Sequence, residues 1–371
     1  MSLGLRADEK GILPDRMIAT LVKMGAIIPA AALDEDQIQP ASIDLRLGEI
    51  AYRVRASFLP GPDATVAERI DELKLHEIAL GDGAVLETGC VYIVPLIESL
   101  ALPADIAAAA NPKSSTGRLD VFTRVIADET RGFDRIRGGY HGPLYAEISP
   151  RTFPVLVREG SRLSQIRLRH GHAMLGADAL VALHARERLV DTPAPDLSDG
   201  VPVGVDLKGF GTDKFIGYRA KRHTGLIDVD RRASYDIAEF WEPIRARRDA
   251  SLILDPDEFY ILASKEAVQV PPDHAAEMVP FDPLVGEFRV HYAGFFDPGF
   301  GYAGAGGGGA RAVLEVRSRD VPFVLEHGQT VGWLRYEKLA AMPDRLYGGS
   351  LGSNYQGQGL QLGRQFRPVG I

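Results

Sequence analysis

Short apolar runs, divided by glycine and proline, recur along the whole chain. In the first half they lie at residues 91–94, 144–148, 155–157 and 165–168. In the second half they lie at residues 259–262, 312–316, 323–325 and 331–334. Many short runs at close spacing predict β-strands that form a sandwich or a barrel. We therefore expect a mainly β protein.

Helical periodicity is confined to a few short stretches. Ile18, Leu21 and Val22 share one face of a helix predicted for residues 15–24, and Gly25 follows it as a stop signal. A second helix is expected at residues 235–248 from a less regular pattern. The predicted fold thus has few and short helices.

The chain contains two copies of one domain. Five pairs of residues share one spacing (260 − 92 = 168), namely Tyr92 and Tyr260, Pro103 and Pro271, Glu147 and Glu315, Pro154 and Pro322, and Gly160 and Gly328. A period this long indicates a duplicated domain, because solenoid repeats span about 20–50 residues. Residues 191–200 have the composition of a linker. We predict domains at residues 1–190 and 200–371.

Composition and charge narrow the class of protein. With 371 residues, 45% hydrophobic and 25% charged, the chain has normal globular composition. The net charge of −8 argues against a general nucleic-acid binder, which normally has a basic face. The single cysteine is typical of a reducing cytoplasm, and no apolar run reaches membrane-spanning length. We expect a cytoplasmic protein that binds neither nucleic acid nor membranes.

One short segment has the composition of a polyphosphate site. It consists of Lys113, Ser114, Ser115, Thr116, Gly117 and Arg118. Hydroxyls and loop amides donate to phosphate oxygens, glycine allows close backbone approach, and arginine binds an anion with a planar fork. The segment predicts a nucleotide ligand.

Two glutamates are candidates for acid–base chemistry. Glu147 lies in an alternating run at residues 144–148, so its carboxylate is expected on a rigid strand near the phosphate segment. Such a group is a candidate general base. Glu315 has the matching place in the second copy. We favour Glu147, because it shares a copy with the phosphate segment.

A zinc-dependent reaction does not fit the chain. Zinc deaminases use His or Cys ligands in H-x-E and P-C-x-x-C arrangements, and Cys90 alone cannot supply them. We expect neither zinc nor another metal held by a cage of side chains.

Four segments together resemble the deoxycytidine triphosphate (dCTP) deaminases. Residues 37–48 are similar to the N-terminal signature of that family and are the most specific match. Residues 114–118 resemble its phosphate segment, residues 139–147 its glutamate hairpin, and residues 347–358 its C-terminal tail. The resemblance implies two tandem dUTPase-like domains, each a β-barrel or jelly roll of the β-clip type.

The resemblance also implies an activity. Hydrolytic deamination of dCTP to dUTP and ammonia, which feeds dUMP and dTTP synthesis, would use Glu147 or Glu315 with Arg118 and Ser114. The implied substrate-binding residues are Lys113, Ser115, Thr116, Gly117, Ala293, Asp297, Tyr347, Tyr355 and Gln358. Mg²⁺ would be bound through the substrate triphosphate.

The resemblance implies partners as well. Besides dCTP and dUTP, dTTP is an expected ligand. The implied assembly is a homo-oligomer, either a trimer or a pseudo-hexamer of domains.

The doubled chain departs from the family pattern. In the second copy Asp282, Pro283 and Gly286 replace Ser114, Ser115 and Arg118 of the first, so that copy lacks the phosphate segment. Its residues 293–300 nevertheless resemble the family's nucleoside-binding turn better than the first copy does. A composite active site is therefore one expectation.

Two other functions stay open. The first is a dUTP diphosphatase, or a bifunctional enzyme that continues from dCTP to dUMP, with Asp297 or Asp134 activating the water. The second is a non-catalytic regulator that binds deoxynucleoside triphosphates, which the altered second copy suggests.

Overall fold

The computed structural model describes residues 9–280, 288–291, 294–305, 308–318, 320–348 and 360–368. The chain forms two compact units. The first unit comprises the chain up to Ala173 together with Gly225–Ser234 and Leu339–Asp344, and the second comprises the remainder. The chain thus enters the second unit upstream of the linker expected at residues 191–200, and later returns to the first unit twice.

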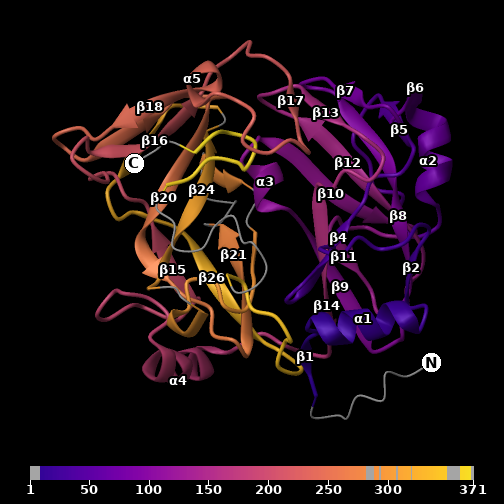
Figure 1. Ribbon diagram of the computed structural model, residues 1–371, viewed down its shortest axis with the longest axis horizontal. Helices are drawn as coiled ribbons and strands as arrows, with labels where there is room; N and C mark the ends of the chain where they lie inside the picture. The colour runs from indigo at the N-terminus through magenta and orange to yellow at the C-terminus, as the bar shows by residue number, and fades with distance from the viewer. Residues whose placement is uncertain are drawn as a thin grey trace. The chain divides into compact units, whose positions relative to one another are not determined.

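In the described part of the first unit, the strands form three sheets (Figure 1). One contains β1 (Gly11–Ile12), β3 (Ile38–Gln39), β4 (Ser42–Leu45), β9 (Ile106–Pro112), β11 (Arg135–Ile136) and β14 (Ser164–His170). Another contains β2 (Ile27–Pro29), β5 (Ile50–Val54), β6 (Lys74–Ala79), β8 (Val91–Ala101), β10 (Val121–Ala127) and β12 (His141–Pro150). The small third sheet contains β7 (Ala84–Leu86), β13 (Val155–Val157) and β17 (Ile227–Asp228).

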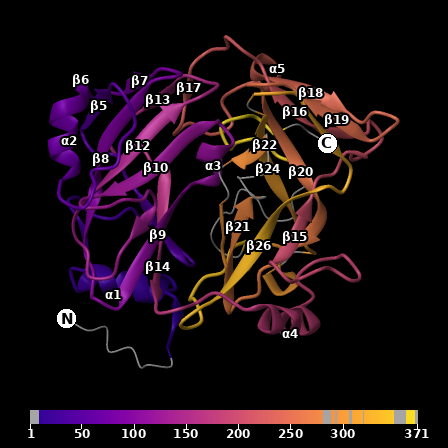
Figure 2. The ribbon, with the colours of Figure 1, turned by 180° about the vertical axis from the view of Figure 1, so that it is seen from behind.

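The second unit repeats this plan (Figure 2). One sheet contains β15 (Val201–Gly204), β21 (His274–Pro280), β23 (Phe295–Phe296) and β26 (Thr330–Lys338). Another contains β16 (Phe215–Ala220), β18 (Trp241–Arg245), β20 (Phe259–Val268), β22 (Phe288–His291) and β24 (Ala310–Ser318). The third pairs β19 (Ser251–Leu254) with β25 (Phe323–Glu326). The prediction of a mainly β protein is confirmed.

The spacing of the repeat reappears in the strands. Both β8 and β20, and likewise β9 and β21, begin 168 residues apart (259 − 91 and 274 − 106). The register repeats as well, because Glu147 lies opposite Ile93 and Glu315 lies opposite Ile261. The two candidate glutamates therefore occupy equivalent positions in their own sheets.

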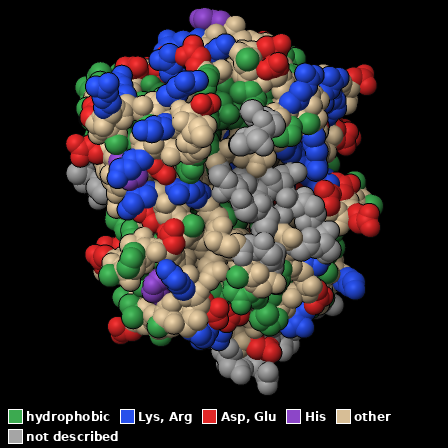
Figure 3. Space-filling model, turned by 60° about the vertical axis from the view of Figure 1, so that its left-hand side comes forward, with side chains coloured by type: hydrophobic (Ala, Val, Ile, Leu, Met, Phe, Trp, Pro, Cys, Tyr) green, Lys and Arg blue, Asp and Glu red, His purple; other side chains and the backbone are tan. Residues whose placement is uncertain are grey.

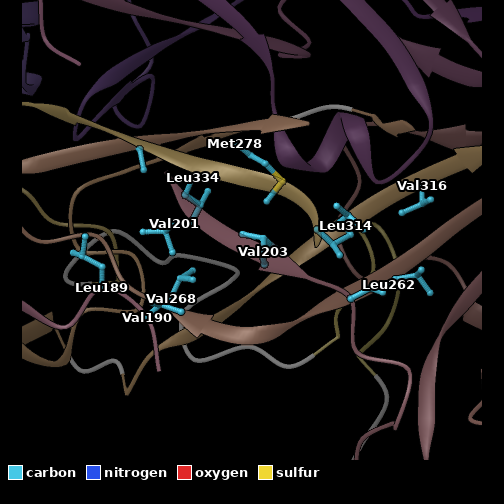
Figure 4. Close-up of a cluster of buried hydrophobic side chains, with 14 of the residues drawn as sticks. Leu189, Val190, Val201, Val203, Leu262, Val268, Met278, Leu314, Val316 and Leu334 are labelled. Carbon is cyan, nitrogen blue, oxygen red and sulfur yellow. The ribbon is translucent and has the colours of Figure 1, made fainter. Parts of the chain in front are cut away.

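Each unit has its own apolar core. In the second unit, side chains from β15, β20, β24 and β26 meet in one cluster, including Val203, Leu262, Leu314 and Leu334 (Figure 4). Burial of this many aliphatic groups, each contributing about 1.5–3 kcal/mol, is the main favourable term in folding. In the first unit, one cluster lies under α1 (Asp15–Lys23) and a smaller one lies under α2 (Val66–Leu73).

The observed helices agree only in part with those predicted. The expected first helix is α1, with Ile18 and Leu21 buried and Gly25 in the left-handed conformation just after it. The apolar pattern does not predict α2, although Thr65 and Glu68 form the capping box that marks its start. Helix α4 (Ala177–Glu187) is not predicted by that pattern either.

The prediction of a helix at residues 235–248 is wrong. The structure has only α5 (Ile237–Phe240), followed at once by β18, which pairs with β16. Pro243 cannot donate an i→i−4 hydrogen bond, and pairing with β16 satisfies the backbone instead. Tertiary pairing therefore overrides a weak local pattern.

One strand of the first unit comes from far along the chain. Residues Ile227 and Asp228 of β17 run parallel to Val155 and Leu156 at the edge of β13. Arg158 Nη1 and Nη2 donate to Asp228 Oδ1 and Oδ2 at 2.9 and 2.8 Å. This bidentate pair and the backbone ladder fasten the segment Gly225–Ser234, which we call the returning segment.

The returning segment should be sensitive to acid. The Arg158 hydrogen bonds lower the pKa of Asp228, although burial opposes them. A lowered carboxyl pKa contributes stability above its unfolded value of about 4, and the contribution is lost as pH falls through the folded value. We expect Asp228→Asn to lower the melting temperature at pH 7, with the gap to wild type closing below about pH 4.

Thermal unfolding of both proteins between pH 3 and 8 checks this expectation. Asp71→Asn, which removes an exposed carboxylate of α2, is the matched control and should change little across the range. If the difference in melting temperature between wild type and Asp228→Asn stays constant down to pH 3, the Asp228 carboxylate is not the source of the acid sensitivity.

Candidate functional site

The predicted phosphate segment folds as a single helical turn, α3 (Ser114–Gly117), which follows β9. The backbone amides of Thr116 and Gly117 donate to the carbonyl of Lys113 at 2.8 and 3.0 Å, which closes the turn. Ser114 is exposed, whereas Ser115 and Arg118 are buried. The Thr116 hydroxyl donates to the Leu163 carbonyl at 2.9 Å, so it fastens the turn to the neighbouring chain.

Lys113 is bound by the N-terminal signature. Its Nζ forms an ion pair with Asp44 of β4, a buried side chain in residues 37–48. Arg162 approaches the same carboxylate at 3.5 Å and also pairs with Asp34 and Asp36. Asp44 therefore sets the direction of the first residue of the phosphate segment.

Two other polar residues of the signature, Gln37 and Arg46, form a buried network with Glu98. Glu98 Oε1 accepts from Gln37 Nε2 at 2.8 Å and from Arg46 Nε at 2.7 Å, and its Oε2 accepts from the Arg46 amide at 2.8 Å. Arg46 also donates to the carbonyls of Ala31 and Ala32. Both carboxylate oxygens of Glu98 are thus satisfied. Residues 37–48, the most specific match to the family, therefore include residues that support the fold.

Glu147 lies on an inner strand of the sheet ordered β10-β12-β8-β5-β6, next to the edge strand β10. It is on β12, between Arg124 of β10 and Ile93 of β8, and only 1% of it is exposed. The Arg124 guanidinium reaches Glu147 Oε1 with Nε at 3.1 Å and Nη2 at 2.5 Å. The second oxygen, Oε2, is buried and has no hydrogen-bond partner among the described residues. One oxygen is therefore anchored and the other is available.

Arg124 is itself enclosed. Its guanidinium lies 3.4 Å from the centre of the Phe133 ring and 4.7 Å from that of Phe122, and Nη2 donates to Ser57 Oγ at 2.9 Å. Nothing in the sequence around Arg124 marks it as a site residue. Only the register of β10 against β12 places it beside a glutamate that is 23 residues away.

Glu315 is buried at the equivalent position on β24, with His291 of β22 opposite it. Arg311, on the same strand, binds Asp206 with Nη1 at 3.0 Å and also the carbonyls of Ser264 and Lys265. The role of Glu315 as a catalytic alternative stays a prediction.

The second unit brings the predicted nucleoside-binding turn and the start of the predicted C-terminal tail together. The Tyr347 amide donates to the Pro298 carbonyl at 2.8 Å, directly after Asp297, and the rings of Tyr347 and Phe300 lie 5.7 Å apart. Phe296 and Phe300 make an edge-on contact at 4.9 Å. The predicted residues Ala293, Tyr355 and Gln358 lie outside the described residues.

Asp134, the alternative acid of the first unit, caps a turn. Its Oδ1 accepts from the Val125 amide at 2.7 Å, and its backbone has a φ of 60°. An aspartate tolerates this left-handed conformation better than most residues. Its geometry is therefore that of a turn residue.

Within the described ranges, no group of three His, Cys, Asp or Glu side chains is placed to hold a metal ion. No helix in the same part of the chain is both long and apolar enough to cross a bilayer. Acidic and basic side chains are interspersed on the face shown in Figure 3.

Comparison with family descriptions covers both halves of the chain. The "2'-deoxycytidine 5'-triphosphate deaminase (DCD) N-terminal domain" matches residues 9–172. The "2'-deoxycytidine 5'-triphosphate deaminase (DCD), C-terminal domain" matches residues 176–366. The chain also resembles the crystal structure of the 2'-deoxycytidine 5'-triphosphate deaminase from Agrobacterium tumefaciens, with 63% identity and a TM-score of 0.86. That match covers 89% of this chain and 99% of the other.

Two shorter relatives match part of the chain. The dCTP deaminase of Halorubrum lacusprofundi is 30% identical over 158 residues, which are 42% of this chain and 75% of the relative. A protein of Methanobrevibacter smithii named "dCTP deaminase, dUMP-forming" is 29% identical over 160 residues, or 42% of this chain and 78% of the relative.

Proposed function

Since this chain belongs to the deoxycytidine triphosphate deaminase family, we propose that it hydrolyses dCTP to dUTP and ammonia with Glu147 as the general base. The activity follows from the family, and the assignment of the base rests on geometry. Ser114 and Arg118 are proposed to assist at the same site.

The surroundings of Glu147 carry this assignment. A base must be held in place while one of its oxygens remains available to the proton it removes. The Arg124 fork holds Oε1, and Oε2 has no partner among the described residues. A buried oxygen without a hydrogen bond costs about 1–3 kcal/mol unless water or a ligand binds it. We place the attacking water at Oε2.

Proton transfer by one carboxylate balances the reaction. Water gives a proton to Glu147 as its oxygen attacks C4 of cytosine, and Glu147 passes that proton to N3. In the tetrahedral intermediate the C4 hydroxyl then gives its proton to the exocyclic amine, the C4–N bond breaks to release ammonia, and the C4 oxygen becomes the carbonyl of uracil. Positioned proton transfer contributes about 10²–10⁴-fold to such a rate.

Substrate binding is proposed from the phosphate segment and the nucleoside turn. Lys113, Ser114 and Ser115 offer a cation and two hydroxyls to phosphate oxygens, and Arg118 offers a guanidinium. Thr116 and Gly117 shape the turn that presents them. In the second unit, Asp297 of the nucleoside turn and Tyr347 of the tail are proposed to contact the substrate, with Ala293, Tyr355 and Gln358 as further candidates.

Magnesium is proposed to arrive with the substrate. Mg²⁺ keeps several waters and prefers phosphate oxygens to an all-protein cage. Asp44, an acid beside the phosphate segment, already binds Lys113 and lies close to Arg162. The donors present therefore fit a metal held by the triphosphate. Assembly as a homo-oligomer and binding of dTTP stay predictions from the family resemblance, and a cytoplasmic location stays a prediction from the composition.

A second activity has one specific observation in its favour. The relative from Methanobrevibacter smithii is named as dUMP-forming, which requires loss of pyrophosphate after deamination. The chain could share that step, with Asp297 as the acid that activates water.

Steady-state turnover of dCTP with magnesium, following ammonia and pyrophosphate together, tests these proposals. Ammonia without pyrophosphate is the expected result, and equal amounts of both would establish the dUMP-forming reaction. If dCTP binds but neither product appears, the chain is a nucleotide sensor and the proposed deaminase activity is wrong.

Omission of magnesium should weaken dCTP binding while leaving the melting temperature of the free protein unchanged.

A further inference from the structure

Arg124 is held from three directions before it meets Glu147. Phe133 stacks on the guanidinium at 3.4 Å, Phe122 lies at 4.7 Å, and Ser57 accepts a hydrogen bond from Nη2. Arginine stacks well on aromatic rings because its guanidinium is planar and weakly hydrated. These contacts restrict the guanidinium to one place and one plane.

That plane directs the Glu147 carboxylate. Arg124 and Glu147 are direct cross-strand partners in the ladder between β10 and β12, so the backbone fixes their separation. Both Nε and Nη2 bind the same oxygen, Oε1. Rotation of the carboxylate would break two charge-assisted hydrogen bonds at once. The direction of Oε2 is therefore set by Arg124.

A purely structural ion pair in the same unit looks different. Glu98 is also fully buried and bound by an arginine, yet three hydrogen bonds satisfy both of its oxygens. At Glu147 only one oxygen is satisfied by the described residues. Native proteins rarely bury an oxygen without a partner unless the site has a use for it.

We propose that Arg124 is a positioning residue for the deamination reaction, which it serves by aiming the free oxygen of Glu147 at the attacking water. This inference rests on the proposed role of Glu147. Arg124 touches the base rather than the substrate, so its loss should lower kcat and leave KM nearly unchanged.

Steady-state kinetics of Arg124→Ala test the proposal. A misplaced catalytic group can cost about 10²-fold, so we expect kcat for ammonia release to fall by roughly that factor, with KM within about threefold of wild type. Guanidinium ion added to Arg124→Ala should recover part of the lost kcat, because the space beside Phe133 still fits it. Arg124→Lys should recover less, since lysine cannot make the fork. Arg69→Gln, which breaks the exposed Arg69–Glu72 pair, is the matched control and should behave as wild type.

Phe133→Leu is a less disruptive variant, which tests the proposal if Arg124→Ala fails to fold. Phe133→Leu keeps the ion pair but removes the stacked ring, and a severalfold fall in kcat at constant KM would support the proposal. Wild-type kcat in Phe133→Leu and Arg124→Lys, while Glu147→Gln is inactive, would overturn the positioning role and leave the base assignment intact. Full activity of Glu147→Gln would overturn both.

Discussion

Glu147→Gln is expected to lower kcat for ammonia release about 10²–10⁴-fold, the contribution of a positioned proton acceptor. The amide has nearly the shape of the carboxylate but cannot accept the proton of the attacking water at Oε2. Binding of dCTP should remain, because the predicted phosphate contacts come from α3 rather than from β12. Single-turnover kinetics with dCTP, together with equilibrium binding, would measure the two effects separately.

Glu315→Gln is the matched control, because Glu315 has the same strand register in the second unit. We expect it to retain most of the activity. If Glu315→Gln is inactive and Glu147→Gln is not, the base belongs to the second copy and the Arg124–Glu147 pair is structural. Loss of activity in both variants would indicate that each glutamate is needed.

Glu98→Ala should be the most destabilising of the substitutions considered, by about 3–5 kcal/mol. It removes a fully buried carboxylate and leaves the buried Arg46 charge with two carbonyl partners and with Asp34, whose carboxylate lies 3.9 Å away. Gln37 loses its partner as well. Urea denaturation, monitored by far-ultraviolet circular dichroism, would measure the change in the free energy of unfolding.

Glu72→Ala provides the comparison for that experiment. Glu72 pairs with Arg69 on the exposed side of α2, and such surface pairs contribute about 0–1 kcal/mol. Equal destabilisation by Glu98→Ala and Glu72→Ala would contradict the view that the signature network supports the fold.

Much of the fold could be predicted because its strands are local patterns. The runs around Tyr92, Glu147 and Val155 became β8, β12 and β13, and their counterparts at a spacing of 168 became strands too. The helix at residues 235–248 failed because pairing with β16 decides that segment, and pairing is not a local property. The capping box of Thr65 and Glu68 was a local signal for α2 that the apolar pattern alone did not reveal.

The site was predictable only in part, for a related reason. Ser114 and Arg118 stand out because several phosphate-binding residue types adjoin each other in sequence. Arg124 does not, since its importance depends on which residue of β12 it faces. Lys113 and Asp44 are 69 residues apart, and nothing in either segment alone indicates that they form an ion pair.

The returning segment has a consequence for the history and the engineering of this chain. Doubling of a gene normally yields two modules that can later be separated, lost or exchanged. Here β13 of the first unit takes its parallel edge strand, and Arg158 its bidentate carboxylate, from Gly225–Ser234. A cut between residues 173 and 174 would leave that edge bare and prone to pair with other chains. The duplication has thereby become difficult to reverse, and half-length fragments are poor starting points for expression.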